Sequence, residues 1–100
     1  IWIYVSGVVN VKPDAQHLRA AIYEYGAVAV AVDASNMTAW GTHYKPSTVL
    51  GLNHDDCSSE KSDTNHAVLA VGWGEYTSGD KTIQYFIVKN SWGSDWGNLG

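Results

Sequence analysis

The chain has 100 residues, of which 45% are hydrophobic and 16% are charged, and its formal net charge is −4. This length favours a single domain, and the composition is that of a globular chain rather than a disordered one. The few lysines and arginines are scattered, and no apolar stretch approaches membrane-spanning length, so neither nucleic-acid binding nor membrane insertion is expected.

The first part of the chain predicts a strand followed by a helix. Residues 1–12 alternate loosely between apolar and polar positions, which is typical of a strand. Asp14 is a favourable helix N-cap, and Gly26 is typical of the residue that follows a helix. Between them, helical spacing places four apolar residues on one face, namely Leu18, Ala21, Ile22 and Tyr25. We therefore predict a short amphipathic helix over residues 15–25.

The remainder of the chain predicts strands separated by a long loop. Residues 27–33, AVAVAVD, form an apolar alternating strand, and residues 34–63 show no clear period. Two further strands are predicted at 66–71 and 83–89, because both stretches are apolar and rich in β-formers. Residues 72–82 are rich in Gly, Ser, Thr and Asp, which indicates a turn.

A hairpin of these two strands brings a histidine and an asparagine together. If it turns near Ser78 and Gly79, residues that face each other have numbers summing to about 156, although a bulge shifts this register by one or two residues. His66 then lies opposite Asn90. An amide oxygen that accepts from one ring N–H fixes the tautomer and orientation of the imidazole and aims the other nitrogen at a nucleophile. Taken alone, the same pair is more often only structural.

Two sequence blocks favour the catalytic interpretation. Residues 64–74 read TNHAVLAVGWG, and residues 85–100 read YFIVKNSWGSDWGNLG. Both resemble the two C-terminal signature blocks of papain-like cysteine peptidases, and the preceding residues resemble the same half of that family more weakly. The resemblance implies an α+β fold over residues 1–100: a mainly antiparallel sheet, barrel-like, with one short helix.

The resemblance also implies roles for four residues around the predicted pair. His66 matches the catalytic histidine, which takes the proton of a cysteine and later protonates the leaving amine. Asn90 matches the residue that orients this histidine. Trp92 matches an indole that shields the His–Asn hydrogen bond from water, and Trp96 matches an aromatic residue on the leaving-group side of the cleft.

Four further residues match positions that bind substrate in the family. Ala31, Thr64 and Ala67 match the walls of the main specificity pocket, and Asn65 matches a residue whose backbone carbonyl binds the substrate chain. Small walls suit a bulky apolar side chain, and because none of these positions is acidic, no strong preference for basic side chains is expected.

The single cysteine, Cys57, is not expected to be the nucleophile. Its neighbours Asp55, Asp56 and Glu60 would repel a thiolate, whereas a reactive cysteine needs the opposite field. The resemblance implies instead a disulfide with a cysteine beyond residue 100. No metal or cofactor is expected, because consecutive residues such as those at 54–57 rarely point at one ion.

The resemblance finally implies partners and leaves alternatives open. It implies a second, mainly helical half that carries the nucleophilic cysteine, so the chain by itself is expected to be inactive. It also implies peptide or protein substrates, and a propeptide or protein inhibitors as further partners. An extracellular, lysosomal or vacuolar location is expected. One alternative is a homologue that has lost the nucleophile and serves a structural or binding role. Another is a stand-alone binding module, which is disfavoured because the chain is expected to begin within a strand and to end within a motif.

Overall fold

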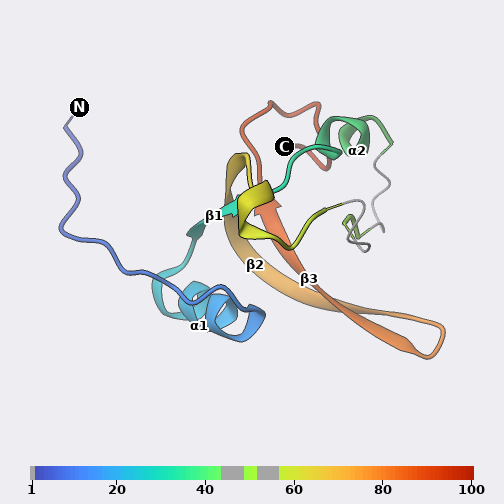
Figure 1. The fold of residues 1–100 in the computed structure, drawn as a ribbon, viewed down its shortest axis with the longest axis horizontal. Coiled ribbons are helices and arrows are strands. Elements are labelled where there is room, and N and C mark those ends of the chain that lie inside the picture. Colours follow the sequence, from blue (N-terminus) through green and yellow to red (C-terminus); the bar gives the residue numbers. More distant parts are fainter. Residues whose placement is uncertain (1, 44–48, 52–56) are drawn as a thin grey trace.

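The fold is a three-stranded antiparallel sheet with a helix packed against two of its strands (Figure 1). The computed structural model describes residues 2–43, 49–51 and 57–100. The elements are α1 (Ala15–Tyr25), β1 (Val28–Val32), α2 (Met37–His43), the 3-10 turn η1 (Lys61–Asp63), β2 (His66–Ser78) and β3 (Lys81–Lys89). The sheet order is β1-β2-β3, and the prediction of an α+β fold is confirmed.

Helix α1 confirms the predicted helix and both of its boundaries. The Asp14 carboxylate accepts the His17 N–H at 2.8 Å, and Gly26, with a φ of 91°, follows the last helical residue. Ala21 and Ile22 are buried beside the sheet strands that α1 contacts. The predicted apolar face is wrong at Tyr25, which is 62% exposed in the last turn, where the chain already leaves the helix toward β1.

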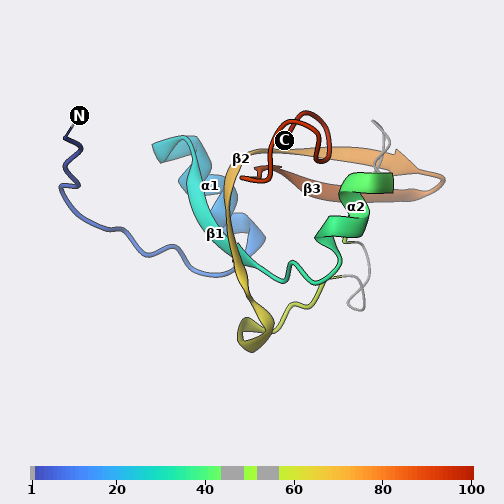
Figure 2. The same ribbon diagram turned by 90° about the horizontal axis from the view of Figure 1, so that it is seen from above.

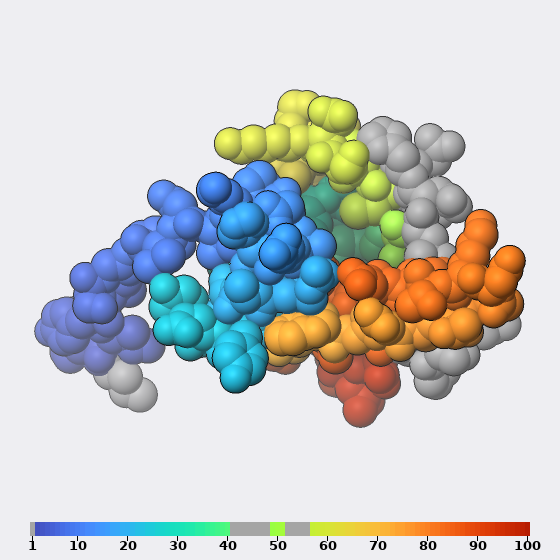
Figure 3. Space-filling view, turned by 90° about the horizontal axis from the view of Figure 1, so that it is seen from below, coloured from blue at the N-terminus to red at the C-terminus, as the bar shows by residue number. Residues whose placement is uncertain are grey.

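The N-terminal segment does not form the predicted strand. Residues 2–12 carry no strand assignment, and the segment extends away from the body of the molecule (Figures 1 and 3). Its large side chains are exposed, including Trp2 at 87% and Tyr4 at 88%. A strand forms only against a neighbour that satisfies its N–H and C=O groups, and none of the described strands pairs with this segment.

The described part of the stretch between β1 and β2 contains secondary structure that was not predicted. It contains α2 and η1 where a loop was predicted. Met37, which is buried, and Trp40, which is half-buried, lie three residues apart on α2. Two apolar residues are too few to establish a helical period in the sequence. Figure 2 shows α2 and α1 in different parts of the molecule, with the β2–β3 hairpin extending past α2.

The hairpin is longer than predicted and turns later. Strand β2 continues through the segment that was predicted as a turn, and Ser78 pairs with Lys81 across Gly79 and Asp80. The predicted pairing of His66 with Asn90 is therefore wrong: Leu69 faces Lys89 at the end of the β2–β3 ladder, and His66 pairs with Val32 of β1. A β-bulge between Ala70 and Gly72 then shifts the register by one residue back toward the predicted one.

Gly74 explains why a glycine-rich segment forms a strand here. The ring of its cross-strand partner, Tyr85, occupies the space that a side chain at Gly74 would need. Glycine in this strand therefore permits close packing rather than a turn.

Candidate active site

His66 and Asn90 form a direct hydrogen bond at one end of the β2–β3 hairpin. His66 is the first residue of β2, and Asn90 is the first residue after β3. The His66 Nε2 atom lies 2.8 Å from the Asn90 Oδ1 atom. The predicted proximity is confirmed although the predicted register is wrong, because the two residues meet beyond the last pair of the ladder.

A backbone donor fixes the protonation pattern of this pair. The Ser91 N–H donates to Asn90 Oδ1 at 2.8 Å. Because a backbone N–H can only donate, the atom that it contacts is the amide oxygen and not the amide nitrogen. An amide oxygen can only accept, so His66 must carry its proton on Nε2 and donate it. In the neutral ring, Nδ1 then has a lone pair available for a proton.

Asn90 is buried, and in the described part of the chain half of its amide has no partner. The residue is 5% exposed, and its Nδ2 atom donates to none of the described residues. A buried donor that is left unpaired destabilises the folded state. The amide oxygen thus accepts from two donors, whereas no described residue accepts from the amide nitrogen.

Two indoles follow Asn90, and the first of them covers the histidine. The Trp92 ring stacks on the His66 ring with a centroid separation of 4.8 Å and an interplanar angle of 24°. Trp96 meets Trp92 edge-on at 5.6 Å and 85°. Trp92 remains 40% exposed, so one face of its indole covers the imidazole while part of the ring reaches the surface.

The segment that carries these indoles is closed on itself and tied to α2. The Asn90 N–H donates to the Gly100 carbonyl at 2.9 Å, and the Gly100 N–H donates to the Trp96 carbonyl at 2.8 Å. The Trp96 indole N–H donates to the Met37 carbonyl at 2.7 Å. Gly93, with a φ of 91°, permits the turn between the two indoles.

The residues matched to the substrate pocket lie next to His66. Ala31 and Ala67 are exposed cross-strand partners on β1 and β2. Since consecutive strand residues point to opposite faces, Ala67 and His66 lie on different faces of the sheet. The Asn65 side chain accepts the Ala34 N–H at 2.9 Å, and the Thr64 hydroxyl donates to the Lys61 carbonyl at 2.8 Å, so both are held in place.

Cys57 lies in a separate hydrogen-bonded cluster around Asp33. Its thiol donates to the Asp33 carbonyl at 3.7 Å. The Asp33 carboxylate, which is largely buried, accepts the N–H of Ser35 and the N–H of Ser58, both at 3.0 Å. Cys57 and His66 share no hydrogen bond in the described parts of the chain. Asp55 and Asp56, whose charges entered the sequence argument, lie outside the described residues.

Sequence reasoning missed two groups that build this site. Ser91 contributes only its backbone N–H, and Met37 contributes only its carbonyl. A backbone contribution leaves no side-chain signature in the sequence. Within the described ranges, no group of three or more His, Cys, Asp or Glu side chains is arranged to hold a metal ion. The helices described are also too short or too polar to cross a membrane.

This arrangement of sheet, hydrogen-bonded histidine and covering indoles occurs in a chain whose residues 2–100 match the family model described as papain family cysteine protease. The chain belongs to this family. It is 34% identical over 100 residues to cathepsin J of Rattus norvegicus, covering 96% of this chain and 27% of that protein. It is 34% identical over 99 residues to procathepsin L of Mus musculus, covering 95% of this chain and 26% of that protein.

A third relative comes from an insect. The chain is 37% identical over 100 residues to a cathepsin L-like peptidase of Aedes aegypti, covering 95% of this chain and 25% of that protein. The chain therefore spans about a quarter of the length of these relatives.

Proposed function

We propose that this chain supplies the base and the orienting amide of a Cys–His–Asn triad that hydrolyses peptide bonds, and that the cysteine comes from a segment outside these residues. The observation that carries the proposal is the 2.8 Å bond between His66 Nε2 and Asn90 Oδ1, whose polarity is fixed by the Ser91 N–H. That bond leaves Nδ1 as the atom that can accept a proton. A positioned imidazole is the usual general base in such chemistry.

In the proposed reaction, His66 Nδ1 first accepts a proton and later donates it. The thiol of the nucleophilic cysteine transfers its proton to His66 Nδ1, and the thiolate attacks the substrate carbonyl carbon. The imidazolium then returns the proton to the leaving amine as the C–N bond breaks, which leaves a thioester. Water, deprotonated by the same nitrogen, hydrolyses the thioester and regenerates the thiol.

Trp92 and Trp96 would support this chemistry without touching the transferred proton. The stacked indole of Trp92 restricts water on one face of the imidazole, and a lower local dielectric strengthens the hydrogen bond to Asn90. Trp96 holds Trp92 through their edge contact, and its own N–H is anchored on α2. We assign both as positioning residues, with Trp96 also lining the leaving-group side of the cleft.

The remaining roles rest on the family and belong to the same proposal. Ala31, Thr64 and Ala67 would wall the main substrate pocket, and the Asn65 carbonyl would bind the substrate backbone. The nucleophile would reside in a helical half, Cys57 would pair with another cysteine, and the setting would be extracellular, lysosomal or vacuolar. The name of procathepsin L leads us to include a propeptide among the partners.

Hydrolysis by histidine variants tests the proposal. In the full-length protein that contains these residues, His66→Ala should reduce cleavage of a peptide substrate by at least about 100-fold, the low end for general acid–base catalysis. His17→Ala, which removes an exposed histidine on α1, is the matched control and should retain activity. Full activity in His66→Ala, or equal losses in both variants, would contradict the proposal. These 100 residues alone should not cleave the substrate.

A further inference from the structure

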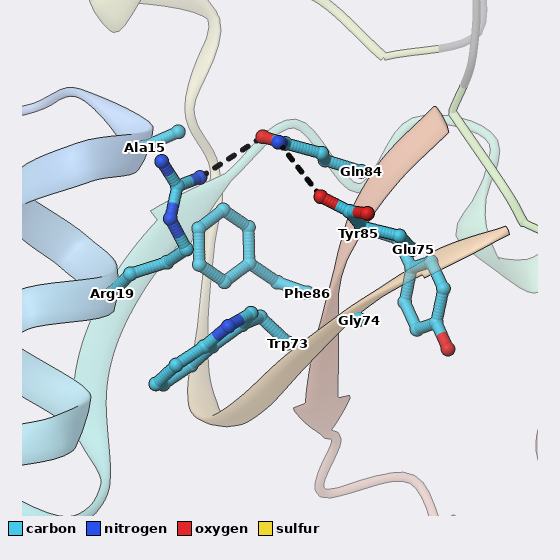
Figure 4. A pocket seen from close by; sticks show the side chains of 8 residues that line it. All are labelled: Ala15, Arg19, Trp73, Gly74, Glu75, Gln84, Tyr85 and Phe86. Carbon is cyan, nitrogen blue, oxygen red and sulfur yellow. Dashed lines mark hydrogen bonds between the residues drawn. The ribbon is translucent and has the colours of Figure 1, made fainter. Parts of the chain in front are cut away.

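A second candidate site lies between α1 and the β2–β3 hairpin, away from His66. It is a cavity of about 410 Å³, within the size range of small ligand pockets. Its lining combines two residues of α1 with three consecutive residues of each strand (Figure 4). Trp73 is seven residues along β2 from His66, which is roughly 23 Å of strand, so the cavity is not part of the site described above.

One half of this cavity is an aromatic surface. Trp73 and Phe86 are cross-strand partners and therefore share a face of the hairpin. Trp73 is 41% exposed, and Phe86 is half-buried. Figure 4 shows the two rings beneath the side chain that reaches over from α1. An accessible pair of large rings suits an apolar side chain of a ligand.

The other half of the cavity presents a cation without a counterion. Arg19 extends from α1 toward the strands and is half-buried (Figure 4). One of its N–H groups donates to Gln84 Oε1 at 3.1 Å. In the described residues no acidic side chain lies within ion-pair distance of Arg19. Its remaining N–H groups are thus available for a carboxylate, the partner that a guanidinium binds best.

A neighbouring acid determines which end of the cavity an anion can occupy. Gln84 Nε2 donates to Glu75 Oε1 at 3.1 Å, so the amide separates Glu75 from Arg19. The Glu75 carboxylate repels an anion at its own end and accepts N–H donors there. A peptide carries N–H donors, apolar side chains and carboxylates within a few ångströms of one another.

From this we infer that the cavity binds a peptide segment in which an acidic side chain neighbours a bulky apolar one. The carboxylate binds Arg19, the apolar side chain lies on Trp73 and Phe86, and backbone N–H groups face Glu75. Such a site would recruit a protein partner or hold a protein substrate at a distance from the reacting bond. The inference does not depend on peptidase activity.

Titration with two matched peptides tests this site. The probes are acetyl-Ala-Phe-Glu-Ala-amide and its glutamine counterpart, added to the full-length protein labelled with ¹⁵N at tryptophan. We expect the glutamate peptide to shift the Trp73 indole N–H signal and to leave that of Trp92 in place, with at least about tenfold weaker binding of the glutamine peptide. Absence of binding at millimolar concentration, or equal binding of both peptides, overturns the inference.

Variants separate the roles of the charged groups. Arg19→Met keeps the apolar stem and should weaken binding about tenfold, and Gln84→Glu should do the same by giving Arg19 an internal counterion. Glu75→Gln removes a repulsion and should strengthen binding. Lys12→Met removes an exposed cation elsewhere and should change nothing. If Lys12→Met weakens binding as much as Arg19→Met, the attraction is non-specific and the assignment is wrong.

Discussion

Replacing Asn90 by leucine should change stability little while it reduces activity strongly. The substitution removes two hydrogen bonds, from His66 Nε2–H and from the Ser91 N–H. Each of these bonds contributes about 1 kcal/mol to the free energy of unfolding. The loss is therefore about 2 kcal/mol.

The same substitution removes a buried amide nitrogen from which no described residue accepts a hydrogen bond, and an unpaired buried donor costs about 1–3 kcal/mol. Gain and loss are of equal size, so the free energy of unfolding should change by less than about 1 kcal/mol. With a urea m-value of about 1 kcal/mol per molar, the midpoint should move by less than about 1 M.

Urea unfolding followed by circular dichroism measures this change in the free energy of unfolding. Asn98→Leu, at an exposed position in the same segment, is the control for added apolar surface. Peptide cleavage by Asn90→Leu should fall at least about tenfold, because the imidazole loses its fixed tautomer. A loss of stability of about 3 kcal/mol or more would show that Asn90 is chiefly structural and would refute the reasoning.

Three further substitutions test a contact of the site, the packing of the hairpin and the cap of α1. Trp96→Phe removes the N–H that donates to Met37 and should cost about 1 kcal/mol in urea unfolding, whereas Trp2→Phe, at an exposed position, should cost nothing measurable. Gly74→Ala collides with Tyr85 and should destabilise by about 1–3 kcal/mol, whereas Gly7→Ala, which meets open space, should not. The backbone N–H of His17, and to a smaller extent its ring, lower the pKa of the Asp14 carboxyl below its ordinary value of 3.8. The ionised cap therefore stabilises the folded state fully above that ordinary value, and the stabilisation disappears as the pH falls through the lowered pKa. Asp14→Asn should flatten this acid dependence of helicity, and an unchanged acid profile in the variant would show that another group is responsible.

The helix could be predicted from the sequence because its signals are local. Asp14, the apolar face and Gly26 all lie within one short stretch, and each acts on neighbouring residues. The hairpin register could not be predicted in the same way. It depends on the bulge between Ala70 and Gly72 and on the fit of Tyr85 over Gly74, which are contacts across strands.

The candidate site could be predicted only in part, because some of its contacts join residues that are far apart in the sequence. The sequence blocks identify His66 and Asn90, and these two residues are hydrogen-bonded. The link from Trp96 to Met37 joins residues 59 positions apart through a backbone carbonyl, so no side-chain pattern could indicate it. The N-terminal segment shows the converse, since a strand-like pattern in residues 2–12 forms no strand without a neighbour.

In the proposed mechanism, His66 is held by Asn90 and takes the proton of a cysteine thiol. The rate at which iodoacetamide alkylates the proposed nucleophilic cysteine of the full-length protein would report the thiolate directly, because the thiolate and not the thiol reacts. At a pH near 6, well below the ordinary cysteine pKa of about 8.5, we predict rapid alkylation in the wild type and at least about tenfold slower alkylation in His66→Ala. Equal rates in the two proteins would contradict the account.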